Sequence, residues 1–257
     1  MRNADGVKNL RHIVDGEGDL FIIVSAMGKT TNALERVFTH MQKVEKEAAN
    51  EEIRQIQEYH AAIIDELWGE HTDINEVTLL FGQLRNIVND IVYRPSDAEL
   101  WYDTIVAFGE LISTTIISKY LNHTGLRNRW IDMRTTFVTN ERHKDANVNI
   151  KASELRLKAA LENTGVGVFV GQGFIGAAPD GTTTTLGREG SDYSAAVVAH
   201  ILDAESMSVW KDVDGVLNAD PKTFKDAVKI DALNYLDTIS CRGERIRYTD
   251  TGAEVTL

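Results

Sequence analysis

The stretch that indicates the fold class is Leu20-Phe21-Ile22-Ile23-Val24, followed by Ser25-Ala26-Met27-Gly28. A continuous apolar run of this length, ending in small and polar residues, predicts a strand buried on both faces, as in a parallel sheet. A second such run occupies residues 166–170. Helical patterns separate the predicted strands, so we expect an α/β fold with a largely parallel sheet.

Residues from about 35 to 95 carry apolar positions at helical spacing with little strand pattern. We expect them to form a helical lobe beside the sheet. Thr31 or Asn32 is the expected cap of the helix after the first strand. Ser96, with Glu99 three residues later, predicts a capping box at the start of another helix.

The composition excludes several classes of protein. A net charge of −12, from 27 Lys and Arg against 39 Asp and Glu, argues against a nucleic-acid partner, which requires a basic face. No apolar run approaches the roughly 20 residues that span a bilayer, so we expect no membrane segment. Residues 1–5 lack the apolar core of a secretory signal. The single cysteine, Cys241, fits a cytoplasmic protein, and the scattered histidines predict no zinc site.

One motif, Thr183-Thr184-Thr185-Leu186-Gly187-Arg188-Glu189-Gly190-Ser191-Asp192-Tyr193, gathers glycines, hydroxyls and an arginine ahead of a small-residue helix. Backbone N–H groups and one cation at a helix N-terminus suit an anionic ligand. Ser191 or Asp192 could instead only cap that helix, and Arg188 could pair with a nearby acid. Capping alone leaves the threonines and glycines before it unexplained.

A second motif, Trp210-Lys211-Asp212-Val213-Asp214-Gly215-Val216, follows a short apolar strand and leads into Asn218-Ala219-Asp220-Pro221. Ligands of open α/β sheets collect at such strand ends. The alternative is that Lys211, Asp212 and Asp214 are ordinary turn residues.

Three further features have both a functional and a structural interpretation. Glu110 lies in an otherwise apolar helix, which leaves little room for a solvated face, and Gly109 beside it would let a substrate approach the helix backbone. Residues 28–30 resemble the end of a phosphate-binding P-loop but lack its first glycine. Residues 171–176 match Gly-x-Gly-x-x-Gly, yet a turn follows where a dinucleotide site requires a helix.

Taken in order, these segments resemble the catalytic domain of aspartokinases, which have the amino acid kinase fold. The resemblance covers roughly residues 18–229, and the run from Thr183 to Tyr193 is its most specific part. It implies a three-layer αβα sandwich as one catalytic domain over 1–257, with the nucleotide-binding part at about 165–257. It also implies transfer of phosphate from MgATP to the β-carboxylate of L-aspartate, the entry step to lysine, threonine and methionine.

The resemblance assigns roles residue by residue. The positions that would hold aspartate are Ser25, Thr31, Glu110, Arg188 and Ser191. Arg188 would grip the α-carboxylate and Glu110 would meet the α-ammonium, while Asp192 would organise Mg²⁺ or cationic groups at the catalytic centre. We assign no residue to a resident metal.

Contacts to ATP fall, by the same resemblance, on a different set of residues. These are Lys211, Asp212, Leu217 and Lys222. Leu217 stands where many family members carry an aromatic residue, so its contact is expected to be apolar only. The family commonly forms oligomers, so a homo-oligomer is implied.

The chain departs from the family pattern in three places. The family's opening strand and Lys-Phe-Gly-Gly-Thr-Ser loop would end about where Met1 stands, residues 238–257 show no resemblance, and no regulatory ACT domain follows. We therefore expect a truncated or fragmentary catalytic domain with weak or no activity, because losing one preorganised donor lowers rates by ~10²–10³.

Two alternatives remain open. A related kinase could act on another acceptor, as do glutamate 5-kinase, acetylglutamate kinase and uridylate kinase. A ligand-binding or partner subunit without turnover is the alternative outside enzymes.

Overall fold

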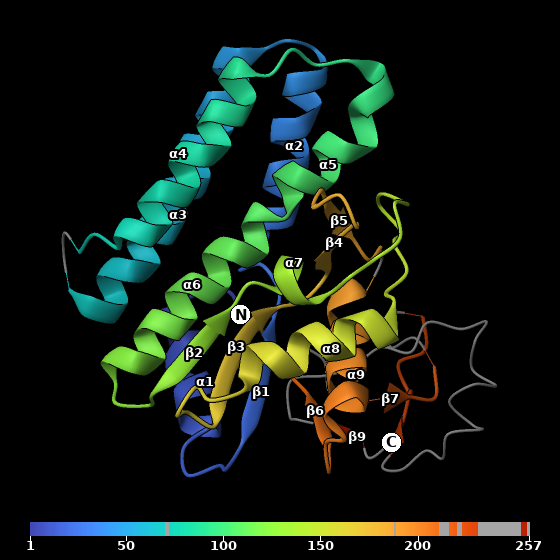
Figure 1. Ribbon diagram of the computed structural model, residues 1–257. Coiled ribbons are helices and arrows are strands. Elements are labelled where there is room, and N and C mark those ends of the chain that lie inside the picture. The colour runs from blue at the N-terminus through green and yellow to red at the C-terminus, as the bar shows by residue number, and fades with distance from the viewer. Residues whose placement is uncertain (70–71, 188, 211–215, 220–222, 231–252, 256–257) are drawn as a thin grey trace. The chain divides into compact units, whose positions relative to one another are not determined.

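The computed structural model in Figure 1 describes residues 1–69, 72–187, 189–210, 216–219, 223–230 and 253–255. The chain divides into two compact units, Met1–Ser194 and Ala195–Leu257, and each is described by itself. Helix α9 (Gly190–Leu202) begins in the first unit and continues into the second.

A parallel sheet organises the first unit. Its strands are β1 (Leu20–Val24), β3 (Val168–Gln172) and β2 (Asn128–Ile131), in the order β1-β3-β2. Leu20 and Asn128 both pair with Val168, so the three strands begin level with one another. Every residue of β3 is buried, as expected for a central strand of a parallel sheet. The strand predicted from the apolar run 20–24 is confirmed, but residues 20–23 are only half-buried, so the predicted burial on both faces is wrong.

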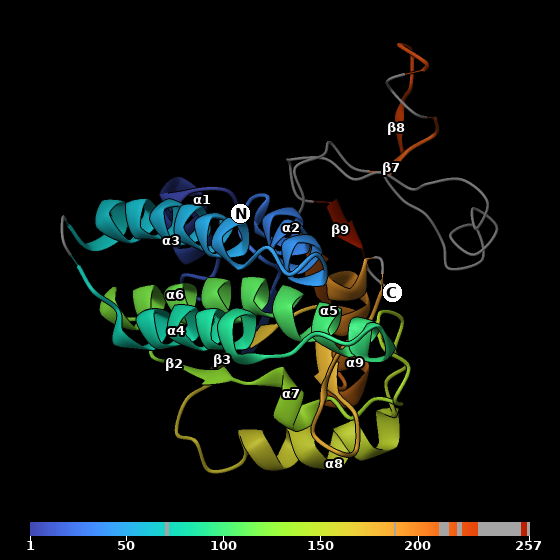
Figure 2. The ribbon, with the colours of Figure 1, turned by 90° about the horizontal axis from the view of Figure 1, so that it is seen from above.

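Helices lie on both sides of this sheet. Helix α6 (Phe108–His123) contacts all three strands, and α1 (Ala4–Ile13) packs against α6. Figure 2 shows α8 (Ile150–Leu161) on the far side of β2 and β3 from α6. The structure therefore has the αβα layering that the resemblance implied.

Long helices follow β1, in the region predicted to be helical. They are α2 (Thr30–Gln42), α3 (Lys46–Trp68) and α4 (Asn75–Asp90), followed by a 3₁₀ turn at Pro95–Asp97 and α5 (Ala98–Val106). Helix α3 contacts both α2 and α4, and α4 contacts α6. Ile53, Ile56 and Ile63 lie on the buried face of α3, which is the amphipathic stripe that joins such helices.

Two of the expected helix caps are wrong. Helix α2 begins at Thr30, one residue before the predicted cap, and the Thr30 hydroxyl donates to the Met27 carbonyl at 2.6 Å. Ser96 lies inside the 3₁₀ turn and its hydroxyl donates to the Asp97 carboxylate at 2.7 Å, so no capping box forms with Glu99. The N-cap residues of α2 and α5 are Lys29 and Asp97, and neither makes a side-chain capping bond.

The stretch Pro95–His123 is helical almost throughout and has a mean hydropathy of 1.2 over its most apolar window. Its length and composition would suffice to cross a bilayer, which the sequence analysis did not foresee. However, 78% of that window is buried inside the protein, as in a core helix.

A short hairpin follows β3, formed by β4 (Ile175–Ala177) and β5 (Thr183–Thr185). Val138 makes an isolated bridge to Ala177 shortly after the short helix α7 (Met133–Thr136). In the second unit, β6 (Met207–Val209) pairs with β9 (Ala253–Val255), and β7 (Val216–Leu217) pairs with β8 (Lys229–Ile230).

Candidate active site

Several of the predicted site residues surround the carboxyl ends of β1 and β3. The N–H of Gly173, just past β3, donates to the carbonyl of Val24 at 2.9 Å. This bond holds the ends of the two strands together, at the edge where open α/β sheets bind ligands. Ser25 follows Val24 directly and is exposed.

Glu110 lies in the first turn of α6 and is only 3% exposed. One carboxylate oxygen, Oε1, accepts the N–H of Ala26 at 3.2 Å. The other, Oε2, is buried with no hydrogen-bond partner among the described residues. Burial raises the pKa of Glu110 to about 8, against which the Ala26 N–H acts weakly. The interpretation of Glu110 as a solvated surface residue is therefore wrong.

Helix α6 and the end of β1 are joined at two further points. The Ser113 hydroxyl donates to the Ser25 carbonyl at 2.8 Å. A Cβ on Gly109 would lie 2.8 Å from the Cβ of Ala26. The missing side chain of Gly109 therefore makes room for Ala26, and not for a substrate as the sequence analysis predicted. These contacts place Ser25 and Glu110 side by side. Thr31 is the second residue of α2 and is half-buried.

Ser191 and Asp192 lie in the first turn of α9, because the helix begins at Gly190. They therefore do not occupy the N-cap position that the alternative interpretation gave them. A Cβ on Gly173 would lie 2.5 Å from Ser191 Oγ, so only glycine allows α9 to approach the end of β3. The Phe174 N–H donates to Ser194 Oγ at 3.0 Å and holds the same contact. Ser191 and Asp192 are both half-buried.

Of the other predicted site residues, the structure describes only Leu217. Arg188, Lys211, Asp212 and Lys222 lie outside the described residues. Leu217 pairs with Lys229 in the β7–β8 hairpin of the second unit and is half-buried. The glycine motif 171–176 leads into β4 rather than a helix, which excludes a dinucleotide fingerprint there.

No three His, Cys, Asp or Glu side chains gather into a metal-binding group in the part of the chain that the structure describes. Magnesium in kinase sites takes one or two carboxylates and completes its coordination with phosphate oxygens and water. A half-buried carboxylate such as Asp192 at the start of α9 fits that donor set.

Two buried polar groups behind the site were missed by the sequence analysis. Gln172, at the end of β3, donates to Thr114 Oγ1 at 2.8 Å and accepts the Met133 N–H at 2.8 Å. Thr114 in turn donates to the Glu110 carbonyl at 2.8 Å. Asp103 of α5 is fully buried and accepts bonds from residues 144 and 185. A lone polar residue in an apolar run was the available signal for both.

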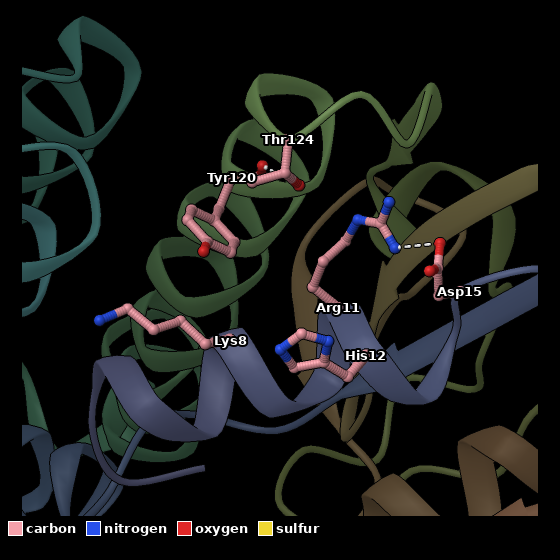
Figure 3. Close-up of a pocket in the computed structure, with 6 residues that line it drawn as sticks. All are labelled: Lys8, Arg11, His12, Asp15, Tyr120 and Thr124. Atoms are coloured by element: carbon pink, nitrogen blue, oxygen red, sulfur yellow. Dashed lines mark hydrogen bonds and ion pairs between the residues drawn. The ribbon is translucent and has the colours of Figure 1, made fainter.

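A separate hollow of about 350 Å³ lies between the carboxyl-terminal ends of α1 and α6 (Figure 3). Its lining residues are Lys8, Arg11, His12, Asp15, Tyr120 and Thr124, and none is a predicted site residue. Arg11 is bound by Asp15 at 2.6 Å, and two helix C-termini disfavour an anion. The basic residues there complement the end of α1 and form no second active site.

Known proteins match this chain over most of its length. The amino acid kinase family matches residues 3–252, which extends into the segment 238–257 where no motif resemblance was found. The chain belongs to the amino acid kinase family. The resemblance inferred from the motifs is confirmed.

Among its relatives, lysine-sensitive aspartokinase 3 of Escherichia coli is 31% identical over 217 residues, covering 84% of this chain and 47% of the relative. An aspartokinase of Chlamydia trachomatis is 29% identical, covering 96% and 55%. The crystal structure of E. coli aspartokinase III with aspartate and ADP superposes with a TM-score of 0.78 at 26% identity, covering 89% of this chain and 50% of that one. The chain thus spans about half the length of these relatives.

Proposed function

We propose that this chain phosphorylates the β-carboxylate of L-aspartate with MgATP, giving 4-phospho-L-aspartate and ADP. The observation that carries the proposal is Glu110, a buried carboxylate beside the exposed Ser25, with one oxygen that has no hydrogen-bond partner among the described residues. A buried acid of this kind is a partner for a ligand's ammonium group. The aspartate and ADP bound in the similar E. coli structure support the choice of substrates.

In this proposal Glu110 pairs with the α-ammonium of aspartate, and Ser25, Thr31 and Ser191 donate hydroxyl hydrogen bonds to carboxylate oxygens of the same ligand. Arg188 grips the α-carboxylate as a bidentate partner. Binding through these groups fixes the orientation of the amino acid, so that its β-carboxylate is the group left to react.

The chemistry then needs no general base, because a carboxylate acceptor is already ionised at pH 7. A β-carboxylate oxygen forms a bond to the γ-phosphorus while the bond from that phosphorus to the β,γ-bridging oxygen breaks, and ADP leaves with the electron pair. Alignment and charge neutralisation supply the catalysis.

Magnesium would arrive with ATP and neutralise charge on its phosphates. Asp192 would hold the ion, and with Arg188 would form the catalytic centre. Lys211, Asp212, Leu217 and Lys222 are the proposed contacts to ATP.

The test measures aspartate-dependent release of ADP from MgATP in a coupled assay. Direct titrations with aspartate and with ATP measure binding separately. L-Glutamate, N-acetyl-L-glutamate and UMP serve as competing acceptors. We expect ADP release with aspartate and with none of the other three acceptors. Turnover with another acceptor would contradict the proposal, and binding of both ligands without ADP release would favour a binding subunit.

A cytoplasmic location and a homo-oligomer complete the proposal. Light scattering after gel filtration measures the oligomeric state, and a monomeric mass at micromolar concentration would contradict it.

A further inference from the structure

Asp103 is a fully buried carboxylate that the proposed mechanism does not use. It lies near the end of α5, and its two oxygens accept several hydrogen bonds. Thr185 Oγ1 donates to Oδ1 at 2.6 Å, and the Lys144 N–H lies 3.2 Å from Oδ1 and 3.0 Å from Oδ2. His143 Nδ1 is 2.9 Å from Oδ2. Burial raises the pKa of Asp103, and these donors oppose the rise.

These bonds join three segments that are far apart in the sequence: α5, the loop at residues 140–147 and the strand β5. A second contact ties the loop to α5, because Lys144 Nζ lies 4.6 Å from the centre of the Tyr102 ring. The loop is also bound to β5 directly, since the Ala146 N–H donates to the Thr185 carbonyl at 2.9 Å. Asp103 is therefore the buried centre of a three-way junction.

The junction supports the chain that leads from β5 to α9. Gly187 has φ +75°, and a Cβ there would lie 3.0 Å from Asp145 Oδ1 and 3.2 Å from the Lys144 carbonyl. On the other side, the Leu186 N–H donates to the Phe174 carbonyl at 2.8 Å. Residues 186 and 187 are thus held between the loop and residue 174, a few residues before Ser191.

The backbone also connects Asp103 to the turn that carries Glu110. The Ala107 N–H donates to the Asp103 carbonyl and the Leu111 N–H to the Ala107 carbonyl, each at 3.1 Å. Helix α5 therefore continues directly into the first turn of α6, which carries Glu110.

We propose that Asp103 is a positioning residue that holds the Glu110 side and the Ser191 side of the amino-acid site in register, through its bonds to Lys144 and Thr185. The role in ligand binding rests on the proposed function. The register of the β5–α9 connection does not rest on it. The competing explanation is a buried carboxylate that stabilises the fold alone.

The experiment compares Asp103→Asn and Thr185→Val with Thr185→Ser, which keeps the hydroxyl donor. Glu99→Gln removes an exposed carboxylate from the same helix and is the matched control. Each purified chain is titrated with L-aspartate by calorimetry, its melting temperature is measured, and hydrogen exchange is followed in peptides covering 143–146 and 183–187.

We expect Asp103→Asn and Thr185→Val to raise the Kd for aspartate by about tenfold or more, since each removes a hydrogen bond of a charged group. Exchange at 143–146 and 183–187 should accelerate in the same two variants. Thr185→Ser and Glu99→Gln should match the original chain in both measurements.

A lower melting temperature with unchanged Kd and unchanged exchange at 183–187 would overturn the proposal and leave a purely structural residue. If the original chain binds no aspartate, the proposed function fails, and faster exchange at 183–187 would still support the positioning role. If Asp103→Asn does not fold, the Thr185→Val and Thr185→Ser pair decides the question by the same readouts.

Discussion

Glu110 is the residue of the candidate site whose ionisation is most affected by burial. A carboxylate that is 3% exposed and accepts one N–H among the described residues is costly to ionise, because the interior solvates charge poorly. The free protein therefore keeps this residue protonated up to a pH of about 8. A ligand ammonium placed against Oε2 would supply the missing partner and favour the ionised form.

Glu110→Gln should lower aspartate affinity by about a hundredfold or more, because an amide offers the ammonium no opposite charge. The same change should raise the free energy of unfolding at pH 8.5 by about 1–3 kcal/mol, since no buried charge remains. Calorimetric titration and denaturant unfolding measure the two effects. Glu66→Gln, an exposed change on α3, is the control and should alter neither. Weaker binding together with lower stability would contradict this explanation.

Aspartate affinity should rise with pH between about 6 and 8. Glu110 must lose its proton to pair with an ammonium, and its pKa of about 8 makes that loss unfavourable at lower pH. Binding at pH 7 should therefore release a proton, which calorimetry in buffers of different ionisation enthalpy detects. The free energy of unfolding of the unliganded protein should change in the opposite direction. Between pH 4.5 and pH 8 the folded state holds a proton on Glu110 that the unfolded state has lost, so this residue lowers the stability as the pH rises. Proton uptake on binding would contradict the assignment.

At the scale of elements, the contact between the end of β3 and the start of α9 tolerates no side chain at residue 173. Gly173→Ala would place a Cβ 2.5 Å from Ser191 Oγ, so the helix start must shift. We expect weaker aspartate binding and a loss of about 1–3 kcal/mol in unfolding free energy. Gly82→Ala is the matched control, because nothing lies within 4 Å of its Cβ position on α4. That change should stabilise by about 0.5–1 kcal/mol. Equal effects of the two substitutions would contradict the argument.

Helix α3 carries an acid-sensitive residue in its buried face. His60 is fully buried, with Nδ1 2.8 Å from the Ile56 carbonyl and Nε2 unpartnered among the described residues. Burial lowers its pKa to about 4. Below about pH 6.5 this imidazole is protonated in the unfolded chain but stays neutral in the folded chain. The free energy of unfolding therefore falls as the pH drops from 6.5 to 4, by on the order of 2–3 kcal/mol.

His60→Leu should remove most of that loss, because no proton is then taken up on unfolding at this position. Denaturant unfolding at pH 7 and pH 5 measures it, with the exposed His12→Gln as the control. An unchanged difference between the two pH values in His60→Leu would show that other residues carry the acid sensitivity.

At the scale of the whole molecule, the αβα architecture and the kinase family were both predictable, whereas the geometry of the site was only partly so. Ser25, Glu110 and Ser191 were named from motifs, and the structure relates Ser25 directly to Glu110 through α6. The placement of the β5–α9 connection on a loop forty residues earlier in the chain was not foreseen.

Local pattern was sufficient for the parallel strands. The run Leu20–Val24 is apolar throughout, and such a run is enough to predict a strand, although in the structure only Val24 of this strand is buried. Helical spacing identified α3 in the same way. Caps were harder to predict, because a shift of one or two residues in where the helix begins removes a residue from the capping position, as at Thr31 and Ser96.

Asp103 shows the limit of such reasoning. Its partners, Lys144 and Thr185, lie 41 and 82 residues away, and nothing in the residues around Asp103 specifies them. Burial of Glu110 depends likewise on the strand and helix packed over it, since a carboxylate loses its solvent only when distant segments close around it. The strands and the family could be predicted from short stretches of sequence. The protonation of Glu110 and the register of the site depend on residues that are distant in the sequence and meet only in the folded structure.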